Sequence, residues 1–148
     1  MAHHASAPQP SSPGPGPSGP ARYSITVRSE FAAAHALMIA GTREPLHGHN
    51  WLVLATISGP TLDADGLLCD FHTVEDLLKE LTGQFHNRNL NEVEPFTKLN
   101  PSAENVARYF ADELSSGLGA ALAPHARVES VSVTEAPGCV ATYRPDAP

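Results

Sequence analysis

Residues 50–59, NWLVLATISG, are the apolar stretch from which the fold can be predicted. The stretch is rich in β-branched and apolar residues and stops at Gly59-Pro60, which predicts a β-strand followed by a turn. Upstream, residues 22–37, RYSITVRSEFAAAHAL, begin with alternating apolar and polar side chains, the spacing of another strand. If the two strands pair antiparallel, the end of the first lies beside the start of the second.

Two helices are predicted in the middle of the chain. Asp70 is suited to cap a helix that ends at Gly83. Ser102 is suited to cap a second helix, which is expected to end at Gly117 and Gly119.

Two more strands are expected after the helices, over residues 127–135 and 139–144. Residues 38–45 and 84–100 are expected to be loops. The order strand, strand, helix, helix, strand, strand indicates an α+β domain. It predicts a four-stranded antiparallel sheet with two helices on one face.

Composition limits the classes of function. Residues 7–21, APQPSSPGPGPSGPA, contain six prolines and three glycines, so residues 1–21 are expected to be a disordered tail and residues 22–148 one domain. A net charge of −7, with nine basic residues spread singly, argues against a nucleic-acid partner. No signal peptide and no apolar run approaching ~20 residues are found, so a soluble cytoplasmic protein without a membrane partner is expected.

Three histidines suggest a metal site. His47 and His49 flank a glycine, and side chains two apart in an extended segment point to the same face. Taken alone, this pair is also explained by ordinary polar histidines. His35, at the end of the first predicted strand, adds a third imidazole if the strands pair antiparallel. Three histidines with an open fourth position are the arrangement of a catalytic zinc site.

Five short motifs follow in order: FAAAH (31–35), LHGHN (46–50), GLLCDF (66–71), NPSAEN (100–105) and VSVTE (131–135). Together they resemble the 6-pyruvoyl-tetrahydropterin synthase family, which includes the 6-carboxytetrahydropterin synthases. The resemblance implies a T-fold, in which the sheets of several subunits join edge to edge into a barrel. It also implies a homo-oligomer, typically trimers stacked as a hexamer, with a small-molecule pterin bound at subunit interfaces.

The resemblance further implies roles for individual residues. The zinc ligands of the family match His35, His47 and His49. Glu135 matches the carboxylate that anchors the pterin ring, since a carboxylate can accept two hydrogen bonds from a 2-amino-4-oxo pyrimidine. Ser102 falls in the segment that lines the pterin pocket. Glu104 either contacts the site or only favours the helix N-terminus through its charge.

The chain departs from the family at the residues that transfer protons. The synthases use a cysteine shortly before the His-Gly-His, and here that position falls on Arg43 or Glu44. The family's Asp-His pair is replaced by His86 and Asn87, and asparagine cannot titrate. The first interpretation is therefore a pterin-binding homologue that does not run the usual synthase reaction, with a zinc site that is competent whether or not it is filled.

Two alternatives remain. Some family members carry glutamate in an ExxHGH pattern and resemble lyases that cleave the side chain of dihydroneopterin triphosphate to 6-hydroxymethyl-dihydropterin. Glu44 fits that spacing as the base, with His86 as its partner acid or base and Arg43 or Arg88 as a phosphate ligand. The other alternative is a structural oligomer without a ligand, which the retained histidines and Glu135 disfavour.

Overall fold

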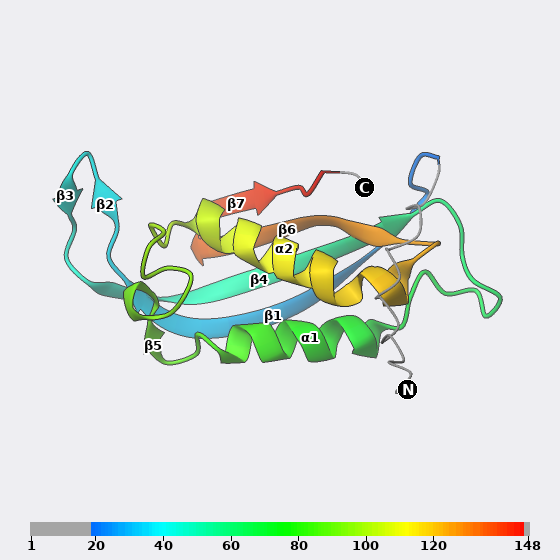
Figure 1. The fold of residues 1–148 in the computed structure, drawn as a ribbon, viewed down its shortest axis with the longest axis horizontal. Coiled ribbons are helices and arrows are strands. Elements are labelled where there is room, and N and C mark those ends of the chain that lie inside the picture. The colour runs from blue at the N-terminus through cyan, green and yellow to red at the C-terminus, as the bar shows by residue number, and fades with distance from the viewer. Residues whose placement is uncertain (1–18, 147–148) are drawn as a thin grey trace, which may run out of the picture.

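The computed structural model describes residues 19–146 and contains one main sheet. Four long strands lie side by side and antiparallel, as the sequence predicts, in the order β1, β4, β6, β7 (Figure 1). Their bounds are β1 Tyr23–His35, β4 His47–Gly59, β6 Arg127–Ala136 and β7 Cys139–Tyr143.

The register between β1 and β4 places the ends of the two strands as the sequence predicts. Tyr23 pairs with Gly59 at one end, and His35 pairs with His47 at the other. Side chains at alternate positions share one face, so Phe31 lies beside Trp51 on the buried face of the sheet, where their rings stack. His35 is four residues after Phe31 and His47 is four residues before Trp51, so the side chains of both histidines lie on that face too.

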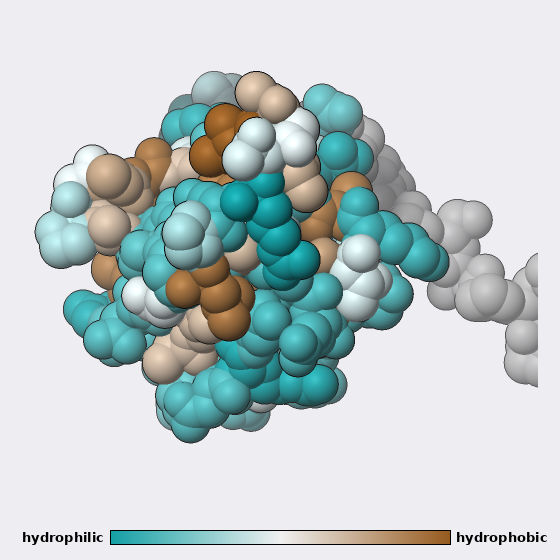
Figure 2. All heavy atoms as spheres, turned by 90° about the vertical axis from the view of Figure 1, so that its left-hand side faces the viewer, coloured by the Kyte–Doolittle hydropathy of each residue, from teal (hydrophilic) through white to brown (hydrophobic). Residues whose placement is uncertain are grey.

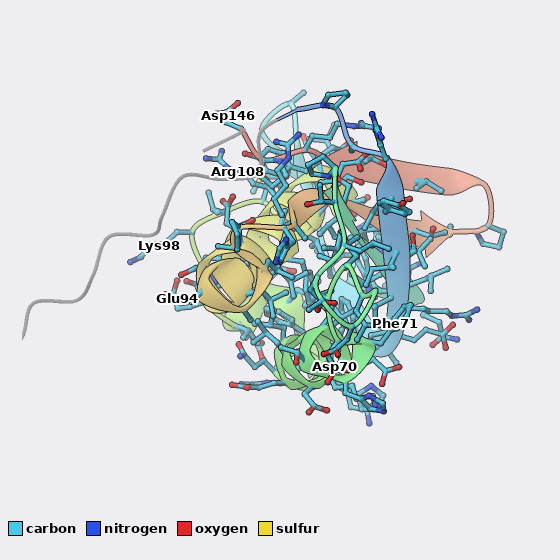
Figure 3. The ribbon with its side chains drawn as sticks, turned by 90° about the vertical axis from the view of Figure 1, so that its right-hand side faces the viewer. Asp70, Phe71, Glu94, Lys98, Arg108 and Asp146 are labelled. Atoms are coloured by element: carbon cyan, nitrogen blue, oxygen red, sulfur yellow. The ribbon has the colours of Figure 1, made fainter. Side chains whose placement is uncertain are left out.

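Two helices cover this face (Figure 1). In α1 (Phe71–Gly83), the Asp70 side chain caps the N-terminus by accepting from the His72 backbone N–H, and Figure 3 shows Asp70 where the helix begins. In α2 (Ala103–Leu122), Ser102 accepts from the Asn105 backbone N–H. Both predicted caps are confirmed. Among residues 19–146, no helix is long and apolar enough to cross a membrane.

The second helix is longer than predicted, because it continues through Gly117 and Gly119 to Leu122. A glycine inside a helix costs about 1 kcal/mol relative to alanine. Burial of Leu118 and Leu122, which continue the apolar stripe, stabilises the fold by roughly 1.5–3 kcal/mol for each leucine. The apolar stripe therefore outweighs the two glycines.

The two predicted loops contain short regular elements. Residues 38–45 form a hairpin of β2 (Met38–Ile39) and β3 (Thr42–Arg43), which projects from one end of the molecule (Figure 1). Its turn residues, Ala40 and Gly41, both have positive φ, as a tight hairpin turn requires. Figure 2 looks onto this end and shows separate hydrophobic side chains among polar ones.

The longer loop adds a fifth strand to the sheet. β5 (Arg88–Asn89) pairs parallel with β1 at Ala33 and Ala34, and a 3-10 turn, η1 (Leu90–Glu92), follows it. Residues 1–18, most of the expected tail, lie outside the described residues. The tail and the domain boundary at residue 22 stay predictions.

Candidate metal centre and ligand pocket

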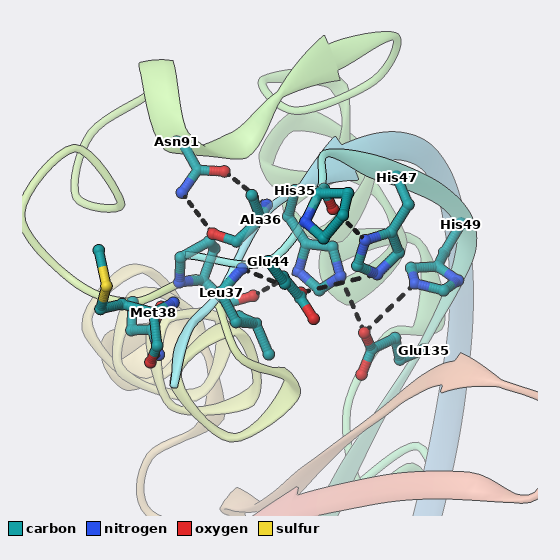
Figure 4. A network of polar contacts seen from close by, with 12 residues as sticks. His35, Ala36, Leu37, Met38, Glu44, His47, His49, Asn91 and Glu135 are labelled. Atoms are coloured by element: carbon teal, nitrogen blue, oxygen red, sulfur yellow. Dashed lines mark hydrogen bonds and ion pairs between the residues drawn. The ribbon is translucent and has the colours of Figure 1, made fainter. Parts of the chain in front are cut away.

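Three histidines and one carboxylate meet at the end of the sheet where the hairpin projects. One side-chain atom from each of His35, His47, His49 and Glu135 lies within 4.8 Å of the others. His35 ends β1, while His47 and His49 begin β4 and come beside it through the strand register. Glu135 lies near the end of β6, next to Thr134, which pairs with β4. The predicted histidine cluster is therefore present, and Glu135 joins it (Figure 4).

Two backbone carbonyls fix how the imidazoles are turned. His35 Nδ1 lies 2.8 Å from the Pro101 carbonyl oxygen, and His47 Nδ1 lies 2.9 Å from that of Pro45. A carbonyl oxygen only accepts, so both Nδ1 atoms carry the proton. In the neutral rings the Nε2 lone pairs of His35 and His47 are therefore free. Metal-binding histidines are oriented by outer hydrogen bonds of this kind.

The atoms that face the centre of the cluster lack ordinary partners. Within the described part of the chain, the buried Nε2 atoms of His35 and His49 have no hydrogen-bond partner. Glu135 Oε1 lies 2.8 Å from His35 Nε2 and 3.3 Å from His49 Nε2. A carboxylate and a nitrogen lone pair both accept, so a cation at this point would relieve the contact. Imidazole and carboxylate together suit a zinc-like divalent metal.

Burial acts on the charge state of His49. In the metal-free protein, burial lowers the pKa of His49, and the neighbouring Glu135 carboxylate opposes that effect less strongly. His35 and His47 lower the pKa further because they would repel a second positive charge. The shift favours the neutral imidazole, which is the form that binds a metal.

Glu44 lies at the border of the cluster. Its Oε1 accepts from the Leu37 backbone N–H at 2.9 Å and is 3.8 Å from His47 Nε2. Its own backbone N–H donates to the Leu37 carbonyl at 3.0 Å. The glutamate that stands near the family's cysteine position is thus anchored next to a predicted metal ligand (Figure 4).

Three other predicted site residues lie outside the cluster. His86 is exposed, and its Nδ1 accepts from the Ala32 backbone N–H at 3.2 Å. Ser102 serves as the cap of α2, and Glu104 is exposed in the first turn of that helix. Their roles in catalysis or pterin binding stay predictions.

An open cavity of about 540 Å³ has His49 in its lining, but Ala32, Ala34 and Gly48 alternate with the histidines along β1 and β4, so most of the cavity faces the opposite side of the sheet. Small residues line part of it, among them Ala32, Ala34 and Gly48, and polar groups line the rest, among them Arg88. A cavity of this size falls in the range of about 300–1,000 Å³ that small-molecule sites occupy.

Sequence reasoning missed the groups that orient the site. The carbonyls of Pro45 and Pro101 hold two imidazoles, and a backbone carbonyl carries no sequence signal of its own. Asn91 and Asn100 bind the chain just after His35 through their side chains. The only available signal was the position of Asn100 and Pro101 within the NPSAEN motif.

The fold and the cluster define a class, a small α+β protein with a candidate metal centre at one end of its sheet. Residues 24–146 match the 6-pyruvoyl tetrahydropterin synthase family, and the chain belongs to this family. The 6-carboxy-5,6,7,8-tetrahydropterin synthase of Bacillus subtilis is 28% identical over 132 residues, which cover 85% of this chain and 88% of that protein.

Solved structures confirm the fold. The 6-pyruvoyl tetrahydropterin synthase of Caenorhabditis elegans gives a TM-score of 0.72 at 21% identity, over 84% of this chain and 96% of that chain. The Plasmodium vivax 6-pyruvoyltetrahydropterin synthase, in a variant whose catalytic glutamate is replaced by alanine, gives 0.71 at 20% identity, over 84% and 98% of the two chains. The subunit fold that the five motifs imply, two helices on one face of an antiparallel sheet, is therefore the fold of this chain.

Proposed function

We propose that the protein binds a reduced pterin beside a zinc ion and does not run the usual synthase reaction. The Bacillus subtilis relative is named as a pterin synthase, which supports a pterin ligand here. The metal part rests on one observation, the buried Nε2 atoms of His35 and His49 without a hydrogen-bond partner in residues 19–146.

The residues present fit zinc. His35, His47 and His49 would hold it through Nε2, since two of the rings have Nδ1 committed to carbonyl oxygens. When bound, zinc would polarise an oxygen of the pterin side chain. The protein's own contribution is to orient the imidazoles of His35 and His47 and to favour the neutral imidazole of His49.

Glu135 is the proposed pterin anchor. Both contacts of its carboxylate with histidine use Oε1, which leaves Oε2 for a pterin N–H. The carboxylate is 23% exposed, so a ligand in the open site can reach it. Ser102 and Glu104 stay secondary candidates for pterin contact.

The absence of the synthase reaction is argued from the side chains available for proton transfer. Residues 36–49 contain no cysteine, and Asn87 at the position of the family's histidine cannot titrate. The experiment is incubation of zinc-loaded protein with dihydroneopterin triphosphate, followed by chromatography of the products. Formation of 6-pyruvoyl- or 6-carboxytetrahydropterin at rates typical of the family would refute the proposal.

A second candidate function is a lyase with Glu44 as the base. The observation that favours it is the position of the carboxylate, 3.8 Å from His47 Nε2. The Plasmodium vivax relative has a catalytic glutamate, which agrees with such a role. Glu44 would take the proton of a hydroxyl of the pterin side chain as the adjacent C–C bond breaks, so that the hydroxyl carbon leaves as an aldehyde. The electron pair of the broken bond would pass into the pterin ring, and a proton returned to the remaining side-chain carbon would give the hydroxymethyl product. In the same incubation, 6-hydroxymethyl-dihydropterin that disappears with Glu44→Ala would favour this candidate.

The assembly that we propose is a homo-oligomer, a trimer-based hexamer in the cytoplasm. The main sheet has open edges that support it, because β7 lies at one edge and the two-residue β5 covers only Ala33 and Ala34 of β1 at the other. Exposed strand edges favour pairing with another chain. Light scattering of the purified protein tests this, and a monomer at micromolar concentration would contradict it.

A further inference from the structure

Each of the three residues after His35 is held through both of its backbone groups. Asn91 Oδ1 accepts from the Ala36 N–H at 2.8 Å, and Asn91 Nδ2 donates to the Ala36 carbonyl at 2.9 Å. Asn100 makes the same pair of bonds with Met38, at 2.8 and 3.0 Å. The two asparagines therefore bracket the segment from either side of Leu37.

Leu37, between them, is held by Glu44. The Leu37 N–H donates to the Glu44 carboxylate at 2.9 Å, and the Leu37 carbonyl accepts from the Glu44 N–H at 3.0 Å. The position of the Glu44 side chain thus depends on where the backbone of Leu37 is placed, and that depends on its two neighbours. Figure 4 shows these contacts running from Asn91 through Glu44 to the histidines.

A primary amide suits this task for a chemical reason. It presents one acceptor and one donor side by side, so it pairs with a residue's N–H and C=O as a neighbouring strand does. Aspartate would keep the acceptor but lose the donor, and its carboxylate would face a backbone carbonyl.

Asn100 is itself well anchored. Its carbonyl accepts from the Ser102 backbone N–H and from Asn105 Nδ2, each at 2.8 Å. The next residue, Pro101, provides the carbonyl that accepts from His35 Nδ1. One short segment before α2 therefore holds the backbone of Met38 through its side chain and the ring of His35 through its main chain.

We propose that Asn91 and Asn100 are positioning residues that fix His35 and Glu44 relative to each other. This rests on the proposed function, in which His35 binds the metal and Glu44 lies beside it. The two asparagines form an amide clamp on residues 36–38. Without the clamp, the backbone groups of Ala36 and Met38 lose their hydrogen-bond partners. The positions of His35 and Glu44 relative to each other are then no longer fixed.

The experiment compares Asn91→Ala, Asn100→Ala and Asn100→Asp with wild type and with Thr82→Val. The control removes a buried hydroxyl that bonds to Ser29 at 2.9 Å at the interface of α1 and β1, so it reports a general loss of a hydrogen bond. Two quantities are measured, Co²⁺ affinity with its visible absorption spectrum, and hydrogen exchange of the Leu37 amide by NMR.

The clamp predicts that Co²⁺ affinity falls about 10- to 100-fold in the asparagine variants, as for other outer-sphere changes, while the control keeps its affinity within about twofold. Exchange of the Leu37 amide accelerates at least about tenfold, although neither asparagine touches it. If an alanine variant does not fold, Asn100→Asp, which keeps the side-chain volume, gives the answer. Unchanged Leu37 exchange in folded variants overturns the clamp. If wild type binds no Co²⁺, the metal proposal fails, and the exchange result alone then decides the clamp.

Discussion

His35 Nε2 and Glu135 Oε1 lie 2.8 Å apart, although the His35 proton is committed to Nδ1 by the Pro101 carbonyl. Two acceptors at this distance need a cation between or beside them. A metal ion bound at Nε2 of the neutral imidazole would supply that cation.

Metal removal should destabilise the protein. Zinc that binds only the folded state at about 100 times its dissociation constant adds about 2.7 kcal/mol. For a domain of this size that should raise the Tm by roughly 5–15 °C. Calorimetry of chelator-treated and zinc-loaded protein measures the difference. In His47→Ala the zinc-dependent rise should be lost, and elemental analysis should find the variant metal-free. A zinc-dependent rise in the Tm of His47→Ala would contradict the role of His47 as a zinc ligand.

Glu135→Gln separates a pterin anchor from a metal ligand. The variant should lose pterin affinity about 100-fold, because a charge-assisted acceptor contributes about 1.5–3 kcal/mol for each hydrogen bond. Its zinc content should remain stoichiometric, because three histidines suffice. Calorimetric titration with a reduced pterin and elemental analysis give the two values. Loss of zinc with unchanged pterin affinity would show that Glu135 is a metal ligand and not the pterin anchor.

If the lyase candidate is correct, Glu44→Gln should lower product formation by about 10²- to 10⁴-fold, the range for removing a general base. The amide keeps the size of the side chain and can still accept from the Leu37 N–H. Arg43→Ala, which changes the neighbouring residue in β3, is the control, and this variant should still bind zinc. A Glu44→Gln enzyme with wild-type product formation would exclude Glu44 as the base.

The metal-free protein should lose stability on acidification through His49. Its pKa is lowered by burial from the ordinary 6.5, so the folded state holds fewer protons than the unfolded state. This contribution to stability is present above pH 6.5 and is lost as the pH falls through the lowered pKa. Comparison of the Tm at pH 7.5 and 5.0 should show a smaller fall for His49→Asn than for wild type. An equal fall of the Tm in wild type and His49→Asn would show that His49 is not the cause of the acid sensitivity.

Gly59, at the end of β4, should not tolerate a side chain. An added Cβ would lie 2.0 Å from the His125 carbonyl oxygen, which is backbone and cannot turn away. Gly59→Ala should therefore destabilise by about 3 kcal/mol, at the upper end of the cost of overpacking. Gly83→Ala is the matched control, because nothing lies within 4 Å of its added Cβ. It should stabilise slightly, by about 0.5–1 kcal/mol, in chemical denaturation.

Much of the fold was predictable because its signals are local. The alternation of side chains in β1 and β4 shows which residues share a face of the sheet. It could therefore be predicted from the sequence that His35, His47 and His49 lie on the same face. The caps Asp70 and Ser102 were predicted for the same reason, since a cap acts within a few residues. The end of α2 was not predicted, because burial of its last leucines outweighs the local preference of two glycines.

The sequence by itself determined the four long strands, the two helices and a cluster of three histidines. Only the tertiary structure decided that Glu135 joins them, since its position depends on the register of β6 on β4, which shifts at Thr56 and Ile57. Tertiary contacts also decided the tautomers of His35 and His47, and the clamp on residues 36–38. These features depend on hydrogen bonds to backbone groups, most of them between residues far apart in the chain. Periodicity and spacing do not encode such bonds.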